Sequence, residues 1–306
     1  MTRILVADRI SDDALQILKS SKFEYDFKPE ISAQDLIKEI QNFEGLIVRS
    51  RTKVTKEVIA SGQKLKVIGR AGVGVDNIDI AAAKGRNISV LNTPNALTNA
   101  VAEFTLALML DLARKIPPAD SSMKEHKWEK TKFVGTELKG KTYGTIGIGK
   151  IGQRVAELSR AFGMQIAAND VIPIPPELVK RLDIRVCTPE DIFTIADYVD
   201  LHVPLTPETE NLANYAKFKL MKKTAFLINT SRGKVVNEKD LLRALDEKLI
   251  AGAALDVFEV EPPTLFDLVK RENFVATPHI AGQTLEAQSA AGTEIVELVM
   301  KALNSP

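Results

Sequence analysis

The sequence predicts an α/β protein with two parallel-sheet domains. Short β-rich runs alternate with helical patterns along almost the whole chain, which is typical of βαβ units and parallel sheets. A lysine-rich polar stretch interrupts the alternation once, and the pattern restarts at a glycine-rich turn. A chain of 306 residues with 45% apolar content is long enough for two cores. We therefore expect two Rossmann-like or flavodoxin-like domains with the active-site cleft between them.

The first part of the pattern covers residues 1–94. Strands are expected at 3–7, 45–50, 66–70 and 89–92, and helices at 12–20, 32–41, 55–61 and 77–84. A long apolar helix at about 97–114 follows, and then a polar connecting arm with a short helix around 118–126. Glu103 and Asp111 lie within the apolar stretch, so we expect a buried helix and not a membrane span.

The pattern restarts at Tyr143. Strands are expected at 143–148, 165–170, 184–188, 198–203, 226–230, 251–257 and 274–278, and helices at 151–162, 189–196, 237–247 and 284–303. This organisation predicts one domain at residues 95–282 and another made of residues 1–94 with 283–306.

The charge balance and the cysteine content limit the classes of partner. The chain has 41 basic and 40 acidic residues, so no global field attracts it to nucleic acid or to a membrane surface. The single cysteine, Cys187, rules out an internal disulfide, and the N-terminus does not resemble a signal peptide. We expect a cytoplasmic protein that binds neither nucleic acid nor membrane, and no motif suggests a metal site.

The stretch GIGKIG at 147–152 follows a predicted strand and opens a predicted helix, the context in which GxGxxG indicates dinucleotide binding. Gly147 allows a tight turn, Gly149 lets the backbone approach a pyrophosphate, and Gly152 lets helix and strand pack closely. The pattern also requires an acid about 20 residues later. Asp170 stands 18 residues after Gly152. Since its carboxylate would accept from ribose hydroxyls and repel a 2′-phosphate, we expect NAD and not NADP.

A second glycine cluster, GRAGVGVDN at 69–77, also lies between a strand and a helix. Its spacing does not match the dinucleotide pattern. Two interpretations remain: a flexible turn between a strand and a helix, or a nest of backbone N–H groups that binds a small anion such as a carboxylate.

The chain has three histidines, which limits the choice of proton donor. His126 lies in the lysine-rich arm and is expected to be solvated. His202 ends a strand, where a cofactor contact and a packing role are both consistent with the pattern. His279, in TPHIAG, follows a strand and precedes a glycine-containing loop. It is the best acid/base candidate, because histidine titrates near physiological pH.

A carboxylate beside His279 would favour the imidazolium and keep a proton available for a carbonyl oxygen. Asp256, Glu259 and Glu261 in ALDVFEVEPP are all candidates, and the residues alone do not choose between them. Arg232, in NTSRG, follows another predicted strand. Its guanidinium could bind a carboxylate bidentately, or it could form a surface salt bridge.

Several stretches resemble the D-isomer-specific 2-hydroxyacid dehydrogenases. They are EGLIVRSRTKVT, KVIGRAGVGVDNID, VLNTPN, GTELKGKTYGTIGIGKIG, INTSRGKVVNE, AGAALDVFEVEPP and TPHIAGQTLEAQ. The resemblance implies an NAD-binding domain at 95–282, a substrate-binding domain in the remainder, and a catalytic trio of Arg232, Glu261 and His279. It implies cofactor contacts at Gly147, Gly149, Lys150, Ile151, Gly152, Asp170, His202, Val203, Pro204, Thr230, Ser231, Arg232, Asp256, His279, Ala281 and Gly282. It implies substrate contacts at Arg49, Ser50, Arg70, Gly72, Val73, Gly74 and Asn95.

Arg49 matches a position that family members acting on phosphoglycerate place near the substrate, with Arg51 as a weaker second candidate. A basic group there suits a phosphate. The resemblance therefore implies NAD-dependent oxidation of D-3-phosphoglycerate to 3-phosphooxypyruvate, the first step of serine biosynthesis. Alternatives are reduction of glyoxylate or hydroxypyruvate, or another D-2-hydroxyacid dehydrogenase activity. A different class is an NAD-sensing protein similar to the corepressors of this fold.

The resemblance also bears on assembly and regulation. Family members usually pair through the region of the long apolar helix and the arm, so we expect a homodimer. The sequence ends at Pro306, and we expect no inhibition by serine through the C-terminal regulatory domain that some members carry.

Overall fold

The structure is a computed structural model that describes residues 2–304, and it divides into two compact units. Unit 1 comprises Met1–Thr98 with Gly282–Pro306, and unit 2 comprises Asn99–Ala281. The sequence pattern predicts these boundaries after residue 94 and before residue 283. Each unit has its own parallel sheet, and each is described separately below.

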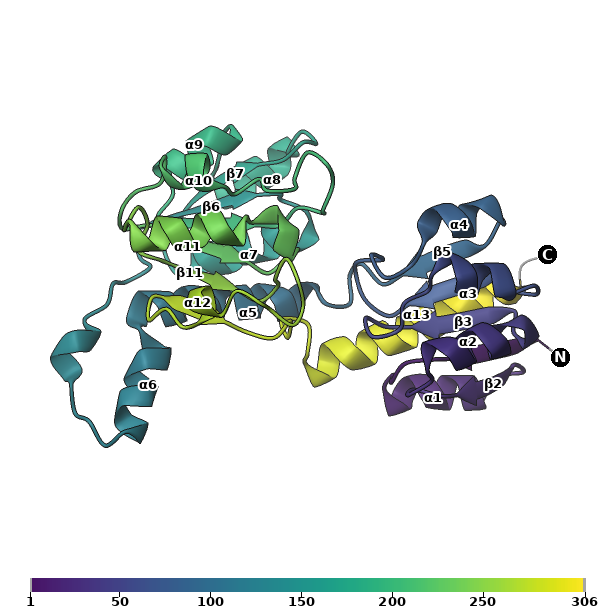
Figure 1. The fold of residues 1–306 in the computed structure, drawn as a ribbon. Coiled ribbons are helices and arrows are strands. Elements are labelled where there is room, and N and C mark those ends of the chain that lie inside the picture. Colours follow the sequence, from purple (N-terminus) through teal and green to yellow (C-terminus); the bar gives the residue numbers. More distant parts are fainter. Residues whose placement is uncertain (1, 305–306) are drawn as a thin grey trace. The chain divides into compact units, whose positions relative to one another are not determined.

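Unit 1 contains a five-stranded parallel sheet in the order β2-β1-β3-β4-β5 (Figure 1). The strands are β1 Arg3–Val6, β2 Glu24–Phe27, β3 Gly45–Val48, β4 Val67–Arg70 and β5 Ser89–Asn92. This is the doubly wound order of flavodoxin-like domains. In this order the strands are added to one side of β1 and then to the other, so the switch point lies between β1 and β3. The segments that follow β1 and β3 therefore meet at the edge where such sheets bind ligands.

Helices cover both faces of this sheet. They are α1 Asp12–Lys19, α2 Ala33–Glu39, α3 Lys56–Ser61, α4 Ile80–Gly85 and α13 Leu285–Asn304, with a 3₁₀ turn η1 at Ile40–Asn42. The C-terminal helix α13 packs against α1, β3 and β4. A Cβ at Gly69 would lie 2.5 Å from Val299, so the glycine in β4 gives α13 the room to approach the sheet.

Unit 2 contains a seven-stranded parallel sheet in the order β12-β11-β10-β9-β6-β7-β8. The strands are β6 Thr142–Ile146, β7 Gln165–Asn169, β8 Ile184–Val186, β9 Tyr198–Leu201, β10 Phe226–Asn229, β11 Gly252–Leu255 and β12 Phe274–Ala276. The strand order reverses between β6 and β9, which is the Rossmann switch point. The predicted fold class, α/β with two parallel-sheet domains of this kind, is confirmed.

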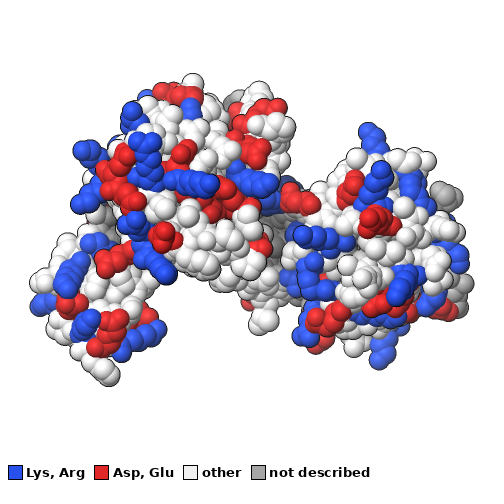
Figure 2. All heavy atoms as spheres, viewed as in Figure 1, with Lys and Arg blue, Asp and Glu red and all other residues white. Residues whose placement is uncertain are grey.

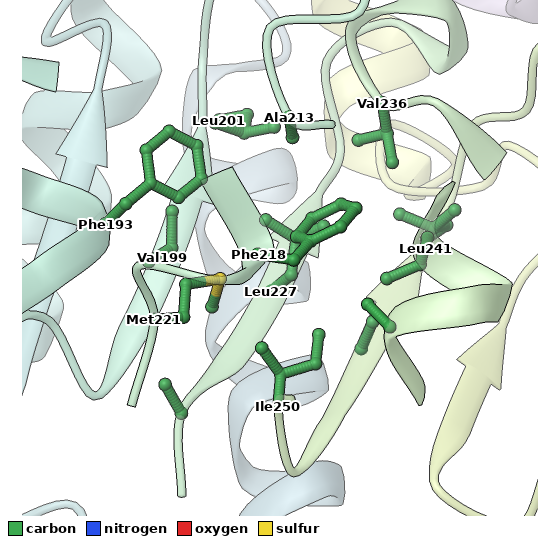
Figure 3. Close-up of a cluster of buried hydrophobic side chains, with 14 of the residues drawn as sticks. Phe193, Val199, Leu201, Ala213, Phe218, Met221, Leu227, Val236, Leu241 and Ile250 are labelled. Atoms are coloured by element: carbon green, nitrogen blue, oxygen red, sulfur yellow. The ribbon is translucent and has the colours of Figure 1, made fainter. Parts of the chain in front are cut away.

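Two hydrophobic cores lie in unit 2. The cluster in Figure 3 includes Phe193, Phe218 and Leu241, which come from helices, and Leu227 from β10. The second cluster joins Tyr143 and Tyr198 of the sheet to other helices. The helices of unit 2 are α5 Thr98–Arg114, α6 Ile116–Lys124, α7 Lys150–Ala161, α8 Pro176–Leu182, α9 Pro189–Ile195, α10 Tyr215–Phe218, α11 Glu238–Asp246 and α12 Phe266–Val269, with 3₁₀ turns η2 Lys130–Phe133 and η3 Gly233–Val235.

Residues 115–135 form an arm that projects from the body of unit 2 (Figure 1). It carries α6 and η2, where the sequence predicts a short helix at 118–126. Large apolar side chains are exposed along it: 49% of Ile116, 54% of Met123, 79% of Trp128 and 72% of Val134. Exposed apolar residues grouped on one segment are typical of an interaction surface.

Acidic and basic side chains are interspersed on the face of the molecule shown in Figure 2. Within residues 2–304, no helix combines the length and the apolar character that a membrane crossing requires. No group of three or more histidine, cysteine or acidic side chains in this range could hold a metal ion.

Candidate active site

Six of the predicted site residues follow strand ends of the seven-stranded sheet. The strands β6, β7, β9, β10, β11 and β12 are followed by Gly147, Asp170, His202, Thr230, Asp256 and His279. Because the strands are parallel, their carboxyl ends meet at one edge of the sheet. The fold of unit 2 thus brings together groups that lie up to 132 residues apart in the sequence.

The glycine-rich turn has the shape that a pyrophosphate requires. Gly147 has a φ of 91°, and a Cβ there would lie 2.3 Å from the backbone oxygen of His202. A Cβ at Gly152 would lie 2.5 Å from the oxygen of Gly147. A Cβ at Gly149 would meet nothing within 4 Å, so this residue borders open space at the N-terminus of α7. The turn therefore fits a dinucleotide, with Gly149 at the place where a phosphate can approach.

Asp170 supports this turn. Its Oδ2 accepts a hydrogen bond of 2.7 Å from the backbone N–H of Ile148, and its Oδ1 accepts one of 3.0 Å from that of Ile172. An ionised carboxylate has about four acceptor positions, so capacity remains for ribose hydroxyls. Asp170 thus has a structural role in addition to the predicted cofactor contact.

His202 packs inside unit 2. Its side chain is 4% exposed, and its Nε2 lies 2.8 Å from Oδ2 of the fully buried Asp200, in a close contact that is not an aligned hydrogen bond. The hydroxyl of Tyr143 donates to the same oxygen over 2.8 Å. Burial, with the neighbouring Asp200 charge, holds the pKa of Tyr143 well above its usual value. Of the two interpretations of the His202 side chain, its burial favours packing, and the cofactor contact at this strand end stays a prediction.

Sequence reasoning missed Asp200. Its pattern YVDLHV indicates a buried strand, and nothing in it reveals that the acid points inward. A signal was present nonetheless, because an acid inside an otherwise apolar strand requires a partner. Tyr143, one strand away, supplies that partner.

Asp256 supports the chain around it, and its expected contact with the cofactor stays a prediction. Its side chain is fully buried. Its two oxygens accept from the hydroxyl of Thr277 over 2.6 Å, from the N–H of Ile280 over 2.9 Å, and from the N–H of Ala281 over 2.8 Å. The carboxylate is engaged by its own chain, so Asp256 orients the loop that carries His279.

Glu261 contacts the histidine. Its Oε2 lies 2.9 Å from Nδ1 of His279, whereas Glu259 accepts a hydrogen bond from the backbone of Glu238. Of these two candidate acids, Glu261 is therefore the one that contacts the imidazole. His279 has a φ of 56°, in the left-handed region, which turns the imidazole out of the line of β12. About half of each side chain is exposed, 49% for His279 and 41% for Glu261.

The pair changes the acidity of both groups. The hydrogen bond to Glu261, opposed by partial burial, raises the pKa of His279 above its usual value. Burial on its own would raise the pKa of Glu261, but the hydrogen bond and the charge of His279 outweigh it and lower this pKa. The contact therefore favours an imidazolium opposite a carboxylate, which suits a group that must hold a proton.

Arg232 belongs to a rigid turn after β10. The amide of Asn229 donates to the backbone oxygen of Arg232 over 2.8 Å and accepts from the N–H of Ser231 over 2.9 Å. Thr230 is buried, and its hydroxyl lies 3.0 Å from that of Thr105 in α5. The charge of Arg232 lowers the pKa of both Glu261 and His279, so the guanidinium acts on the same site.

In unit 1, a buried carboxylate organises the arginine segment. Asp8 is 2% exposed and accepts from the backbone N–H of Arg49 over 2.5 Å, from Oγ1 of Thr52 over 2.7 Å and from Nε of Arg51 over 3.0 Å. Arg51 also donates to the backbone oxygen of Ala7 over 2.7 Å. Arg51 therefore has a structural role, and its substrate contact stays a prediction.

The second glycine turn is held by its own chain. The N–H of Gly72 donates to Oγ1 of Thr93 over 2.8 Å, and the amide of Asn92 donates to the oxygen of Val73 over 2.5 Å. Gly72 has a φ of 141°, and a Cβ there would lie 2.0 Å from Nη1 of Arg70. This position therefore has no room for a Cβ, and the N–H of Gly72 is used within the chain. Its expected contact with the substrate stays a prediction.

The other predicted residues occupy accessible turns or buried packing positions. Ser50, Asn95, Lys150 and Pro204 are exposed; Arg49, Arg70, Val73, Gly74, Ile151, Val203 and Ser231 are half-buried; Ala281 is 4% exposed; and His126 is exposed on the arm. Gly282 packs closely on Leu97, because a Cβ at the glycine would lie 2.3 Å from Cδ2 of Leu97.

Residues 106–281 match the family described as D-isomer specific 2-hydroxyacid dehydrogenase, NAD binding domain. The chain is 45% identical over 306 residues to D-3-phosphoglycerate dehydrogenase of Methanocaldococcus jannaschii, covering 99% of this chain and 58% of that relative. It is 44% identical over 295 residues to the human protein of that name, covering 96% of this chain and 55% of the relative. The chain thus spans about half the length of the curated relatives it matches.

Solved structures agree with the fold. The TT0316 protein from Thermus thermophilus has a TM-score of 0.91 at 34% identity, covering 99% of this chain and 97% of that one. D-lactate dehydrogenase from Aquifex aeolicus, solved with NAD and lactic acid, has a TM-score of 0.85 at 28% identity, covering 99% and 95%.

Proposed function

Because the chain belongs to the D-isomer-specific 2-hydroxyacid dehydrogenase family, we propose that it oxidises D-3-phosphoglycerate to 3-phosphooxypyruvate with NAD, the entry step of serine biosynthesis. The observation that carries this proposal is the contact between Glu261 and His279 beside the charge of Arg232. The relatives named D-3-phosphoglycerate dehydrogenase support the choice of substrate.

Unit 2 is proposed to hold the cofactor. The N–H groups of the turn at Gly149 and the N-terminus of α7 would bind the pyrophosphate, and Asp170 would accept from the ribose. When bound, NAD supplies the hydride acceptor. Residues 150–151, 203–204 and 230–232 border this edge of the sheet and are the remaining proposed contacts; Ala281 and Gly282 would contribute through their backbone.

His279 is proposed as the acid/base group. In the oxidation its neutral imidazole takes the proton of the C2 hydroxyl as the C2 hydride leaves. In the reverse direction the imidazolium protonates the carbonyl oxygen. Nδ1 is engaged by Glu261, so Nε2 is the atom that faces the substrate. Glu261 fixes the tautomer and the orientation of the ring.

Arginines are proposed to recognise the two anionic ends of the substrate. Arg232 would bind the carboxylate bidentately and polarise the C2 oxygen. Arg49 would bind the phosphate; its side chain makes a hydrogen bond of 3.3 Å with the backbone oxygen of Arg9. The turn at residues 70–77 would assist with the carboxylate through Val73 and Gly74.

Steady-state assays test the substrate. D-3-phosphoglycerate, D-glycerate and glyoxylate would be compared in the wild type, in Arg49→Ala, and in Arg271→Ala as a matched control, since Arg271 pairs with Asp246 away from the site. We expect Arg49→Ala to lower kcat/KM for phosphoglycerate by about 10- to 100-fold and to spare glycerate, as for a lost charged hydrogen bond. Preference for glyoxylate would favour a reductase, and NAD binding without turnover would favour a sensor similar to the corepressors.

We also propose that two chains pair through the arm at residues 115–135. Four exposed apolar side chains support an interface there. Replacing Met123 and Trp128 with serine should give a monomer in analytical ultracentrifugation, whereas Leu285→Ser, at an 88% exposed position outside the arm, should not. An unchanged oligomer in the double variant would contradict the proposal. A cytoplasmic location stays a prediction from the single cysteine.

A further inference from the structure

Two glutamates in unit 2 exchange hydrogen bonds with each other's backbone. The N–H of Glu238 donates to Oε1 of Glu259 over 2.8 Å, and the N–H of Glu259 donates to Oε1 of Glu238 over 2.5 Å. Glu238 is the first residue of α11, and Glu259 lies in the segment after β11. The exchange therefore ties a helix start to the segment that carries Glu261.

The backbones of two site segments touch at the same place. A Cβ at Gly233 would lie 1.9 Å from the carbonyl carbon of Phe258 and 2.6 Å from the nitrogen of Glu259. Gly233 directly follows Arg232. The turn that presents Arg232 and the segment that presents Glu261 thus pack backbone against backbone, a few residues from the glutamate exchange.

Glu261 depends on the shape of this segment. Its Oε1 accepts from the N–H of Phe258 over 3.2 Å, and its Oε2 lies 2.9 Å from Nδ1 of His279. The N–H of the next residue, Glu259, is the one that donates to Glu238. A shift of residues 258–259 would therefore move the carboxylate away from the imidazole.

We propose that the reciprocal exchange between Glu238 and Glu259 is a positioning device that holds Glu261 against His279. The positioning of Glu261 is argued from the hydrogen bonds alone, and only its importance for catalysis rests on the proposed dehydrogenase function. Neither glutamate touches the imidazole, so both act through Glu261 and are positioning residues.

The two carboxylates require hydrogen-bond donors at this position. Glu238 is 6% exposed, and burial, with the charge of Glu259, raises the pKa of Glu238. Two acidic side chains this close repel each other unless each is satisfied by a donor, and here each is satisfied by the other's backbone N–H. If either acid becomes an amide, the hydrogen bond from the partner's backbone N–H is retained, because the amide oxygen still accepts it. Glutamine should therefore replace Glu259, and alanine should not.

A histidine titration tests the device without any turnover. The chain has only three histidines, so their ring signals can be followed by NMR, with His279→Gln assigning one of them. The groups that set the charge of His279 are Glu261, Asp256 and Arg232, and none of these changes in the test variants. The variants are Glu259→Ala and Glu259→Gln, with Glu177→Ala, an exposed acid of α8, as the matched control.

We expect Glu259→Ala to lower the pKa of His279 by about half a unit or more, because the contact with Glu261 is the main cause that raises it. Glu259→Gln and Glu177→Ala should titrate as the wild type does. An unchanged pKa of His279 in Glu259→Ala would overturn the inference. A decrease of this pKa in Glu259→Gln as large as in Glu259→Ala would also overturn it. If the wild type lacks dehydrogenase activity, the proposed function fails while this titration still decides the inference.

Discussion

The carboxylate of Glu261 lies 2.9 Å from Nδ1 of His279, across two neighbouring strand ends of the seven-stranded sheet. The strands β11 and β12 pair in parallel, so residues that are 18 apart in the sequence meet at one edge. The contact raises the pKa of His279 and lowers that of Glu261, so it favours the charged form of both groups.

This contact predicts a pH dependence with opposite signs in the two directions. In the proposed mechanism oxidation requires neutral His279, so kcat/KM should rise with pH through the raised pKa of His279. Reduction requires the imidazolium and should fall through the same pKa. Glu261→Gln removes the main cause of the shift, so both transitions should move to lower pH. The pH profiles of the wild type and the variant check this, and an unmoved profile would reject the role of Glu261.

Replacing the acid/base group should separate binding from turnover. His279→Ala should retain the affinity for NAD, because the proposed pyrophosphate turn lies after another strand, β6. Its turnover should fall by about 10²- to 10⁴-fold, the usual contribution of general acid–base catalysis. Fluorescence titration with NADH and steady-state kinetics give the two quantities. Turnover equal to the wild type would exclude His279 as the acid/base group.

Of the glycines in the dinucleotide turn, Gly149 should be needed for NAD binding and Gly147 for the stability of the fold. Gly149→Ala places a methyl group in open space, so the protein should fold normally and lose affinity for NAD. Gly147→Ala would occupy a φ of 91° and collide with the backbone of His202, so it should lower the melting temperature even without ligand. Thermal unfolding and calorimetric titration of both variants check the contrast. Equal NAD affinity in Gly149→Ala and the wild type would contradict the proposed phosphate position.

The Tyr143 hydroxyl should contribute to stability. Tyr143→Phe removes the donor to buried Asp200, and the cost should be about 1–3 kcal/mol. Chemical denaturation measures this cost, with Tyr25→Phe on the half-buried edge strand β2 as the control. A loss no larger than that of the control would show that Asp200 does not depend on this bond.

Most of the fold could be predicted because the buried strands are continuous apolar runs. RILV and GLIV read as parallel strands, and their structure agrees. The edge strand β2 escaped prediction because its sequence, EYDF, is polar and only half-buried. The short helices α8, α10 and α12 also went unpredicted. The helices α10 and α12 have only four residues each, too few for a periodic signal, and α8 begins in the proline-rich run IPIPP at 172–176.

The candidate site could be predicted only in part. Its residue type and its position after a strand identified His279 as a candidate. The sequence pattern could not predict the direction in which each side chain points. Asp256 and Gly72 were expected to face ligands, and both are occupied by hydrogen bonds within the chain. These bonds join residues that lie 25 and 21 apart, so only the folded backbone reveals them.

The buried Asp256 has a mechanical consequence. Ala281 is the last residue of unit 2, and its N–H is one of the groups that Asp256 holds. The chain therefore leaves unit 2 from an anchored point, two residues beyond His279. Tension on the peptide that leads to Gly282 would be taken up by a charge-assisted hydrogen bond at Ala281 before it could turn the imidazole. Asp256 thus fixes the backbone just beyond His279, at the boundary of unit 2.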